Sequence, residues 1–413
     1  MHSSGGRSGS TYTVVLPLVC CKFVPRPSPL LALIGVAVCA HVALAAARVT
    51  TSLYALSLHA SEFTVGTLIG LFALFPMLLA VGMGRIIDRI GVYQPLRFGA
   101  LIGSAGVLVA AAAQSVAGLY LAAVLIGTGF MAIFIATQYA VGTLLEGEEK
   151  TAGFSQLAVG FSVSAFIGPM LAGFTIDHAG HTMAFLVCSV FTLFAFVIAS
   201  GSTLRNLPAQ HNTHVRTRRS ALELLRHREL RGLYFVGITL AAAWDLFTFM
   251  VPVRGTQLGF SASTIGLILA CFSVATFTVR LAMPWIVRRY HEWQILGVTL
   301  SAAALCYAAL PFTQHALTMA LAAFGLGLAL GSGQPNVLAL LHSGAPAGRG
   351  AEAIAIRASL GNLSSVSLPM AYGAVGATLG PFAVFWGLGA LIACAVPVAA
   401  RRARRVVLDR SNN

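Results

Sequence analysis

The feature that most constrains this chain is a succession of long apolar segments that begins near residue 30 and continues almost to the C-terminus. About 20 apolar residues in a helix cross a hydrocarbon core roughly 30 Å thick, and inside lipid every backbone polar group must be paired within the protein. The segments therefore predict an all-α integral membrane protein with twelve transmembrane helices. The spans are predicted at residues 30–59, 64–84, 96–114, 117–141, 153–176, 182–202, 232–257, 263–284, 294–313, 316–341, 353–377 and 380–400.

The composition agrees with a membrane protein. The 413 residues are 57% hydrophobic and 9% charged, whereas a soluble domain is roughly 45–50% apolar and about 25% charged. The seven cysteines are scattered, with no CxxC pair or metal-ligand spacing. We expect them to be packing residues, and we expect neither a metal nor a cofactor.

The basic residues report the orientation in the membrane. The net charge is +14, from 26 Lys and Arg against 12 Asp and Glu, but the cations do not form the single stripe that nucleic-acid binding would need. With the N-terminus in the cytoplasm, they fall overwhelmingly on the cytoplasmic side, and Arg254 is the exception near an outer loop. This asymmetry follows the positive-inside rule. It predicts a multi-pass protein of a bacterial-type inner (plasma) membrane with both termini cytoplasmic, and no nucleic-acid partner.

The polar stretches divide the chain. We expect residues 1–28 to be a disordered N-terminal extension. The alternative is that the start codon has been assigned too far upstream. Residues 29–202 and 232–400 are predicted to form two six-helix bundles. Residues 203–231 form a basic cytoplasmic linker between them, and residues 401–413 form a basic cytoplasmic tail.

The two predicted bundles are related by an internal repeat with a constant separation of 200 positions. Because six spans separate the copies, both have the same orientation, and substrate sites in such folds lie between the halves. The matching positions are Ser61 with Ser261, Thr64 with Thr264, Gly66 with Gly266, Pro169 with Pro369, and Gly173 with Gly373.

The stretch between spans two and three carries a motif, formed by Gly84, Asp88, Arg89 and Gly91. Its spacing resembles the loop signature G-x-x-x-D-R-x-G of the major facilitator superfamily, although Val92 and the residue after it replace the basic pair that follows. The resemblance, together with twelve spans in parallel halves, implies the fold of that superfamily over nearly the whole chain from residue 30.

The resemblance also implies roles for particular residues. It implies that Asp88 and Arg89 gate transport at the cytoplasmic side without binding substrate; topology and helix capping are the alternative. Arg357 lies near the cytoplasmic start of span eleven, where gating contacts of the family are expected.

In span five, Gly168, Pro169 and Gly173 resemble the antiporter signature G-P-x-x-G-G, with Ala172 in place of one glycine. This favours export slightly. Small residues that let helices approach closely would explain the same pattern.

Few ionisable residues lie deep within the spans, and a charge at the bilayer centre costs roughly 2.5–3.5 kcal/mol. Arg48 in span one and Asp245 in span seven are therefore candidates for substrate binding or proton coupling. They form an ion pair that breaks during transport, or Arg48 holds an anion while Asp245 takes a proton, or the pair is structural. His41, two turns before Arg48, is either a proton relay or a packing histidine.

Four buried amides in the predicted spans could line a central cavity or join helices by hydrogen bonds. They are Gln138, Gln334, Asn336 and Asn362.

The sequence predicts a secondary active transporter of a small molecule that works by alternating access and is coupled to protons. The substrate is either an organic anion or metabolite, favoured by Arg48, or an exported amphipathic or cationic compound, favoured by Asp245. The alternative is a polytopic membrane enzyme or sensor, but no HExxH or comparable catalytic set is present, so we expect no enzyme. The expected partners are the substrate and the bilayer, and we expect a monomer.

Overall fold

The computed structural model describes residues 28–113, 115–145, 147–205, 221–344 and 350–411. The described residues form helices joined by short turns, with no β-strand among them. The helices are α1 (Pro29–Ser57), α2 (Glu62–Ile90), α3 (Tyr93–Ala112), α4 (Val116–Leu144), α5 (Gly147–Ala199), α6 (Ser202–Arg205), α7 (Ala221–Arg226), α8 (Arg228–Gln257), α9 (Ala262–Ile286), α10 (Glu292–Ala309), η1 (Leu310–Phe312), α11 (Ala316–Gly344) and α12 (Gly350–Ser411).

Within the described residues, 10 helices are long and apolar enough to cross a membrane. Two of them contain apolar stretches of 44 and 46 residues, in α5 and α12. At 1.5 Å per residue each is roughly twice as long as one crossing requires. Both are broken, at Gly180 (φ 81°) and Gly380 (φ 78°), where the positive φ favours glycine. Each therefore contains two spans, which is consistent with the twelve predicted.

The repeat seen in the sequence is also a repeat in the structure. Ser61 and Ser261 cap α2 and α9 with the same backbone angles, φ −65° and ψ 157°. Each hydroxyl accepts a hydrogen bond of 3.2 Å from the backbone N–H three residues later. The breaks at Gly180 and Gly380 are again 200 positions apart. The fold therefore consists of two copies of one six-helix unit with the same direction in the membrane.

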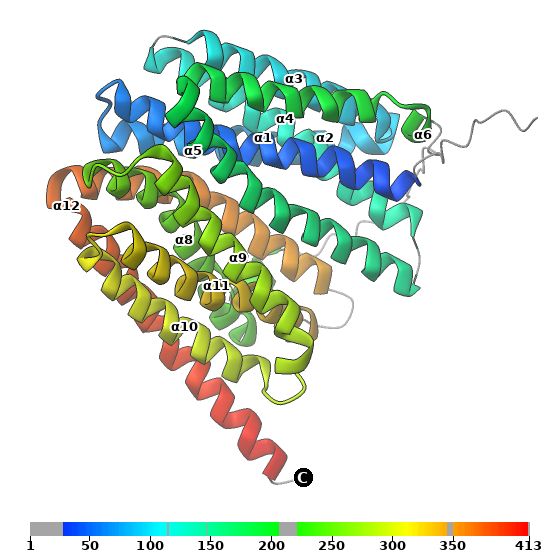
Figure 1. Cartoon of the computed structure of the whole chain (residues 1–413). Helices are drawn as coiled ribbons and strands as arrows, with labels where there is room; N and C mark the ends of the chain where they lie inside the picture. The colour runs from blue at the N-terminus through cyan, green and yellow to red at the C-terminus, as the bar shows by residue number, and fades with distance from the viewer. Residues whose placement is uncertain (1–27, 114, 146, 206–220, 345–349, 412–413) are drawn as a thin grey trace, which may run out of the picture.

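The halves meet along two equivalent helix pairs, α2 with α12 and α5 with α9, and α1 also contacts α8 (Figure 1). At the first pair, Gly66 lies against the carbonyl of Pro369, and at the second, Gly266 lies against the carbonyl of Pro169. Lipid tails supply no hydrophobic drive for helix association, so helices associate through close packing at small residues. Glycine is required at these positions because the facing backbone occupies the space of a Cβ atom.

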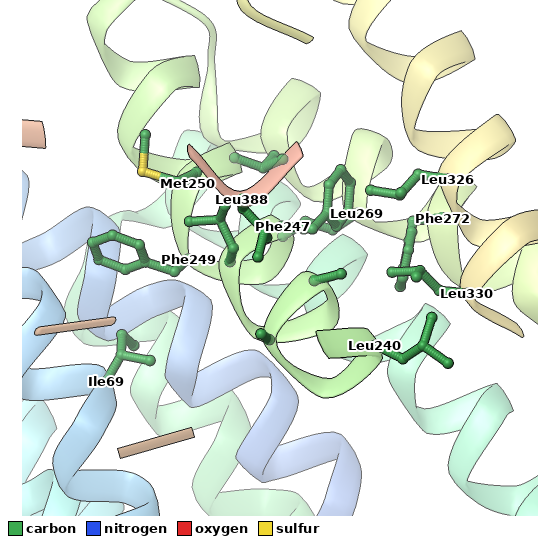
Figure 2. Packing of buried hydrophobic residues seen from close by; sticks show 14 of the residues in the cluster. Ile69, Leu240, Phe247, Phe249, Met250, Leu269, Phe272, Leu326, Leu330 and Leu388 are labelled. Atoms are coloured by element: carbon green, nitrogen blue, oxygen red, sulfur yellow. The ribbon is translucent and has the colours of Figure 1, made fainter. Parts of the chain in front are cut away.

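The largest buried apolar cluster surrounds α8 (Figure 2). Phe247 of α8 stacks on Phe272 of α9 with ring centroids 4.5 Å apart. Leu330 of α11 and Leu388 of α12 belong to the same cluster, as does Ile69 of α2 from the other half. The cluster holds α8 in the centre of the molecule and continues across the interface between the halves.

At three places the helices extend beyond the predicted spans. Residues 84–90, predicted as a loop, are the last turns of α2, because no residue breaks the helix before Gly91, whose φ is 76°. The predicted tail at residues 401–413 continues α12 as far as Ser411, since its Ala and Arg residues are good helix formers. The predicted linker contains α6, α7 and the start of α8, and its residues 206–220 lie outside the described residues, as do residues 1–27.

The close approach at Gly66 leads to a first prediction. A Cβ on Gly66 would lie 2.9 Å from the carbonyl carbon of Pro369, so Gly66→Ala should destabilise the protein by about 1–3 kcal/mol through overpacking. A Cβ on Gly297 in α10 would meet no atom within 4 Å, so Gly297→Ala should stabilise the protein by about 0.4–1 kcal/mol. Thermal unfolding of the purified variants measures both signs, and equal shifts would contradict the close approach of α2 and α12.

Candidate functional site

Three helices are screened from lipid along most of their length. No residue is fully exposed at positions 32–56 of α1, 122–144 of α4 or 232–255 of α8. By contrast α3 presents Phe98 at 57% exposure. Side chains in the middle of α1, α4 and α8 therefore face protein or the space between the halves, where polar groups can be tolerated.

Arg48 and Asp245 lie in two of these central helices, α1 and α8. Asp245 is only 8% exposed, and its carboxylate accepts a hydrogen bond of 2.6 Å from the Ser365 hydroxyl of α12. Arg48 and Asp245 are close enough to attract each other electrostatically. No nitrogen–oxygen contact within 4.0 Å joins them in the described structure, where the guanidinium of Arg48 makes no hydrogen bond. The two residues of the sequence-predicted pair thus lie near each other without a direct salt bridge or hydrogen bond between them.

Two tyrosines, which the sequence pattern did not single out, complete the surroundings of Asp245. Tyr307 of α10 is fully buried and donates its hydroxyl proton to the carbonyl of Ala243 in α8. Tyr307 and Tyr372 of α12 are both within electrostatic range of the Asp245 carboxylate. A tyrosine in an apolar segment resembles a packing residue, so only its polar hydroxyl at membrane depth could have indicated a site.

His41 of α1 lies among aromatic rings. Its ring centroid is 5.4 Å from that of Phe130 in α4 and 5.0 Å from that of Phe161 in α5. The Nδ1 atom is buried and has no hydrogen-bond partner. The structure therefore shows no proton-relay chain through Nδ1 in the described residues.

No hydrogen bond joins any of the four candidate amides to Arg48 or Asp245 in the described structure. Asn336 of α11 is 2% exposed and donates to the carbonyl of Ser332 in its own helix at 2.7 Å. Gln138 of α4 and Gln334 of α11 are half-buried, and Asn362 of α12 is exposed. Asn336 thus neither joins two helices through this bond nor leaves its amide free.

The candidate gating residues lie at one end of the molecule. Gly84 is in the last turns of α2, Arg89 is exposed there, and Gly91 ends the helix; the side chain of Asp88 lies outside the described part of the structure. Arg357 of α12 contacts α8 instead, where a Cβ on Gly237 would be 3.3 Å from its Cγ atom. The Nε atom of Arg357 is buried without a hydrogen-bond partner.

The opposite end, where α1 turns into α2 at His59 and α8 into α9 at Gly259, is here called the hairpin end. There the carboxylate of Asp177 in α5 accepts hydrogen bonds from the backbone N–H groups of Ala262 (2.9 Å) and Ser263 (2.7 Å) at the start of α9. A helix N-terminus presents free N–H groups and a positive dipole, which favour a carboxylate. This contact joins the two halves.

A second contact between the halves at the hairpin end is the 2.6 Å hydrogen bond from the Gln257 amide of α8 to the Glu62 carboxylate of α2. Deeper in the interface, the Arg280 guanidinium of α9 donates to the Ser162 hydroxyl of α5 at 3.2 Å. Polar contacts thus accompany the glycine contacts of the interface. Among the described residues, no group of three His, Cys, Asp or Glu side chains could hold a metal.

These features define the class of protein. A multi-pass membrane protein built from two parallel repeats, with its few deep charges on central helices at the interface of the halves, has the architecture of a membrane transporter. The family model described as the Major Facilitator Superfamily matches residues 32–369 and, in a second match, residues 233–411. The chain belongs to the Major Facilitator Superfamily.

Two curated relatives match part of the chain. An uncharacterized transporter of Buchnera aphidicola subsp. Schizaphis graminum (strain Sg) is 26% identical over 138 residues, which cover 33% of this chain and 35% of that protein. Multidrug resistance protein 2 of Bacillus subtilis (strain 168) is 23% identical over 256 residues, which cover 60% of this chain and 64% of that protein. The chain thus spans less than two thirds of the length of either relative.

Solved structures show the same fold. A POT family transporter in complex with 5-aminolevulinic acid matches with a TM-score of 0.77 at 13% identity, over 93% of this chain and 98% of that chain. The nucleoside transporter NupG matches with a TM-score of 0.77 at 10% identity, over 91% of this chain and 99% of that chain. At such low identity the likeness concerns the fold alone.

The Asp177 contact leads to a second prediction. Asp177→Asn removes the charge from the start of α9 and should weaken the contact by about 1 kcal/mol, so that conformers with a separated hairpin end become about fivefold more populated. Distances between spin labels at His59→Cys and Leu379→Cys, in a background without native cysteines, measure this. Glu292→Gln, the same charge change at the start of α10, should leave the distances unchanged. If Asp177→Asn also leaves them unchanged, the contact does not hold the halves together.

Proposed function

We propose that this protein is a secondary active transporter that moves a small organic anion together with a proton by alternating access. The observation that carries the proposal is that Arg48 and Asp245, one from each half, lie near each other without a direct salt bridge. They lie in central helices, α1 and α8, which contact each other. A charge at this depth is costly, and such a pair is sensitive to any movement of one half against the other. The membrane is a bacterial-type inner (plasma) membrane. Both termini face the cytoplasm, because the basic residues concentrate at the end opposite the hairpin end.

The contacts at the hairpin end belong to one state of the transport cycle. With the Asp177 and Glu62 bonds formed, the halves are joined at the outer side. Opening toward the outside requires these bonds to break and the glycine contacts of α2 with α12 to separate. Arg89 and its neighbours at the other end of α2 would then join the halves on the cytoplasmic side, as the family resemblance implies.

The state of the two charges favours an anion. The Asp245 carboxylate already accepts a bond from Ser365, whereas the Arg48 guanidinium has no hydrogen-bond partner among the described residues and presents donors suited to a carboxylate. A bound carboxylate would compete with Asp245 for Arg48. Asp245, deprived of its counter-charge in a nearly dry site, would take up one proton. A singly charged substrate and the proton would then cross together with no net charge.

A second candidate function is the export of an amphipathic cation. It is supported by the partial similarity to multidrug resistance protein 2 of Bacillus subtilis and by the antiporter-like residues Gly168, Pro169 and Gly173. In that case Asp245 would bind the cation or exchange it for a proton. Two of these residues also make close helix contacts, since Gly168 lies against α1 and Gly173 against α9.

If Arg48 binds the anion, Arg48→Ala should lower the affinity for the transported anion by about 30-fold or more, because truncating a buried charge contact costs about 2 kcal/mol or more. Ligand-induced stabilisation of the purified protein against heat measures this affinity. Arg254→Ala, which removes a cation near the hairpin end of α8, is the matched control and should bind normally. Equal affinity in Arg48→Ala and wild type would reduce Arg48 to a structural role.

If Asp245 carries the coupling proton, Asp245→Asn should abolish accumulation of substrate driven by a proton gradient. Exchange of substrate across the membrane without a gradient should continue, since it needs no change of protonation. Uptake into proteoliposomes with and without an imposed gradient separates the two activities. Accumulation that persists in Asp245→Asn would remove Asp245 from the coupling mechanism.

A further inference from the structure

The N-terminal half contains a closed ring of aromatic side chains that the proposed mechanism does not use. His41, Phe130, Phe134 and Phe161 follow one another with centroid distances of 5.4 Å (His41 to Phe130), 5.6 Å (Phe130 to Phe134), 5.5 Å (Phe134 to Phe161) and 5.0 Å (Phe161 to His41). They come from α1, α4 and α5. We call these four residues the aromatic cluster.

All four side chains of the aromatic cluster are only half-buried. Phe130 and Phe134 lie on α4, which exposes no residue fully between positions 122 and 144 and packs mainly on α1, α2, α3 and α5 of its own half. Because α1 and α4 are screened from lipid, the exposed parts of His41, Phe130 and Phe134 do not face the hydrocarbon. They border either the protein interior or the space between the halves.

The second copy of the repeat has no counterpart of the aromatic cluster. At the positions 200 residues later in the C-terminal half stand Ala241, Leu330, Gln334 and Gly361, and the equivalent helices pack without an aromatic residue at any of them. If the rings served only to fill space between α1, α4 and α5, the second copy would need comparable volume. The difference points to a role outside packing.

The aromatic cluster lies near Arg48. His41 and Arg48 are seven residues apart on α1, on the same face and about 10 Å apart along the axis. Helical side chains lean toward the N-terminus of their helix, so the Arg48 guanidinium leans back toward His41, and the two side chains are within electrostatic range. The buried Nδ1 atom of His41 has no hydrogen-bond partner and lies among these otherwise apolar side chains.

From this juxtaposition we infer that the transported anion is an aromatic carboxylate, whose ring lies against His41, Phe130, Phe134 and Phe161 while its carboxylate binds Arg48. The inference rests on the proposed function and names the substrate class of the same site. Aromatic faces and edges attract one another beyond the effect of apolar burial. The site should therefore distinguish an aromatic ring from a saturated ring of similar size.

The test compares three probes of the same length on the purified full chain: 3-phenylpropanoate, 3-cyclohexylpropanoate and 3-phenylpropylammonium. Wild type should bind 3-phenylpropanoate between about 2-fold and about 13-fold more tightly than 3-cyclohexylpropanoate, although the saturated ring is the more hydrophobic. Phe134→Leu should abolish this preference while changing the affinity for 3-cyclohexylpropanoate by less than about 2-fold. Phe98→Leu, on the exposed face of α3, should preserve it.

The outcomes separate the inference from the proposed function. If both carboxylates bind equally in wild type and both depend on Arg48, the proposed anion transport is supported, but the proposed binding of an aromatic substrate at the aromatic cluster is overturned. A preference that survives in Phe134→Leu and Phe161→Leu also overturns binding at the aromatic cluster. If only 3-phenylpropylammonium binds, in an Asp245-dependent manner, the anion proposal is wrong and the inference falls with it.

Discussion

The structure depends on one constraint of the lipid environment, which is that helices there associate through close packing and not through the exclusion of water. The interface between the halves meets this constraint by bringing backbone against backbone. Gly66 and Gly70 of α2, four residues apart and hence on one face, lie against the carbonyls of Pro369 and Val366. The same geometry recurs at Gly266 and its proline partner on α5. Because these backbone contacts involve no long side chains, they can separate and re-form without side-chain rearrangement at these positions.

The constraint that shapes the interface also decides where charges can be placed. Arg48 and Asp245 would be too costly on a lipid-facing helix, and they lie on α1 and α8, which the other helices screen along most of their length. Their incomplete pairing keeps both charges responsive to a ligand. A fully hydrogen-bonded ion pair would hold the halves in one arrangement, whereas the single bond from Ser365 to Asp245 leaves Arg48 available.

The sequence predicts the helices well because the length and apolarity of a span are local properties, and the repeat is visible because Ser61, Gly66 and Pro169 recur in one register. It also singles out Arg48 and Asp245, since a charge in an apolar segment is conspicuous. It could not indicate Ser365, which reaches Asp245 across 120 positions, or the bond of Asp177 to the start of α9 across 85 positions. Such contacts depend on how helices are placed in space, and common residues such as serine carry no local signal of them.

The repeat gives the molecule a symmetric frame with an asymmetric centre, and this contrast separates movement from recognition. The contacts of Gly66 and Gly266 with the facing backbone recur in both copies, as a rocking motion of equal halves requires. At the centre the copies differ, since the first has Arg48 and His41 where the second has Thr248 and Ala241, and the second has Asp245 where the first has Ala45. A substrate between the halves would therefore meet a cation and aromatic groups on one side and a carboxylate on the other. Positions that the frame leaves free to differ are those at which specificity can evolve without disturbing the movement, so residues that break the repeat are the ones to test for substrate binding.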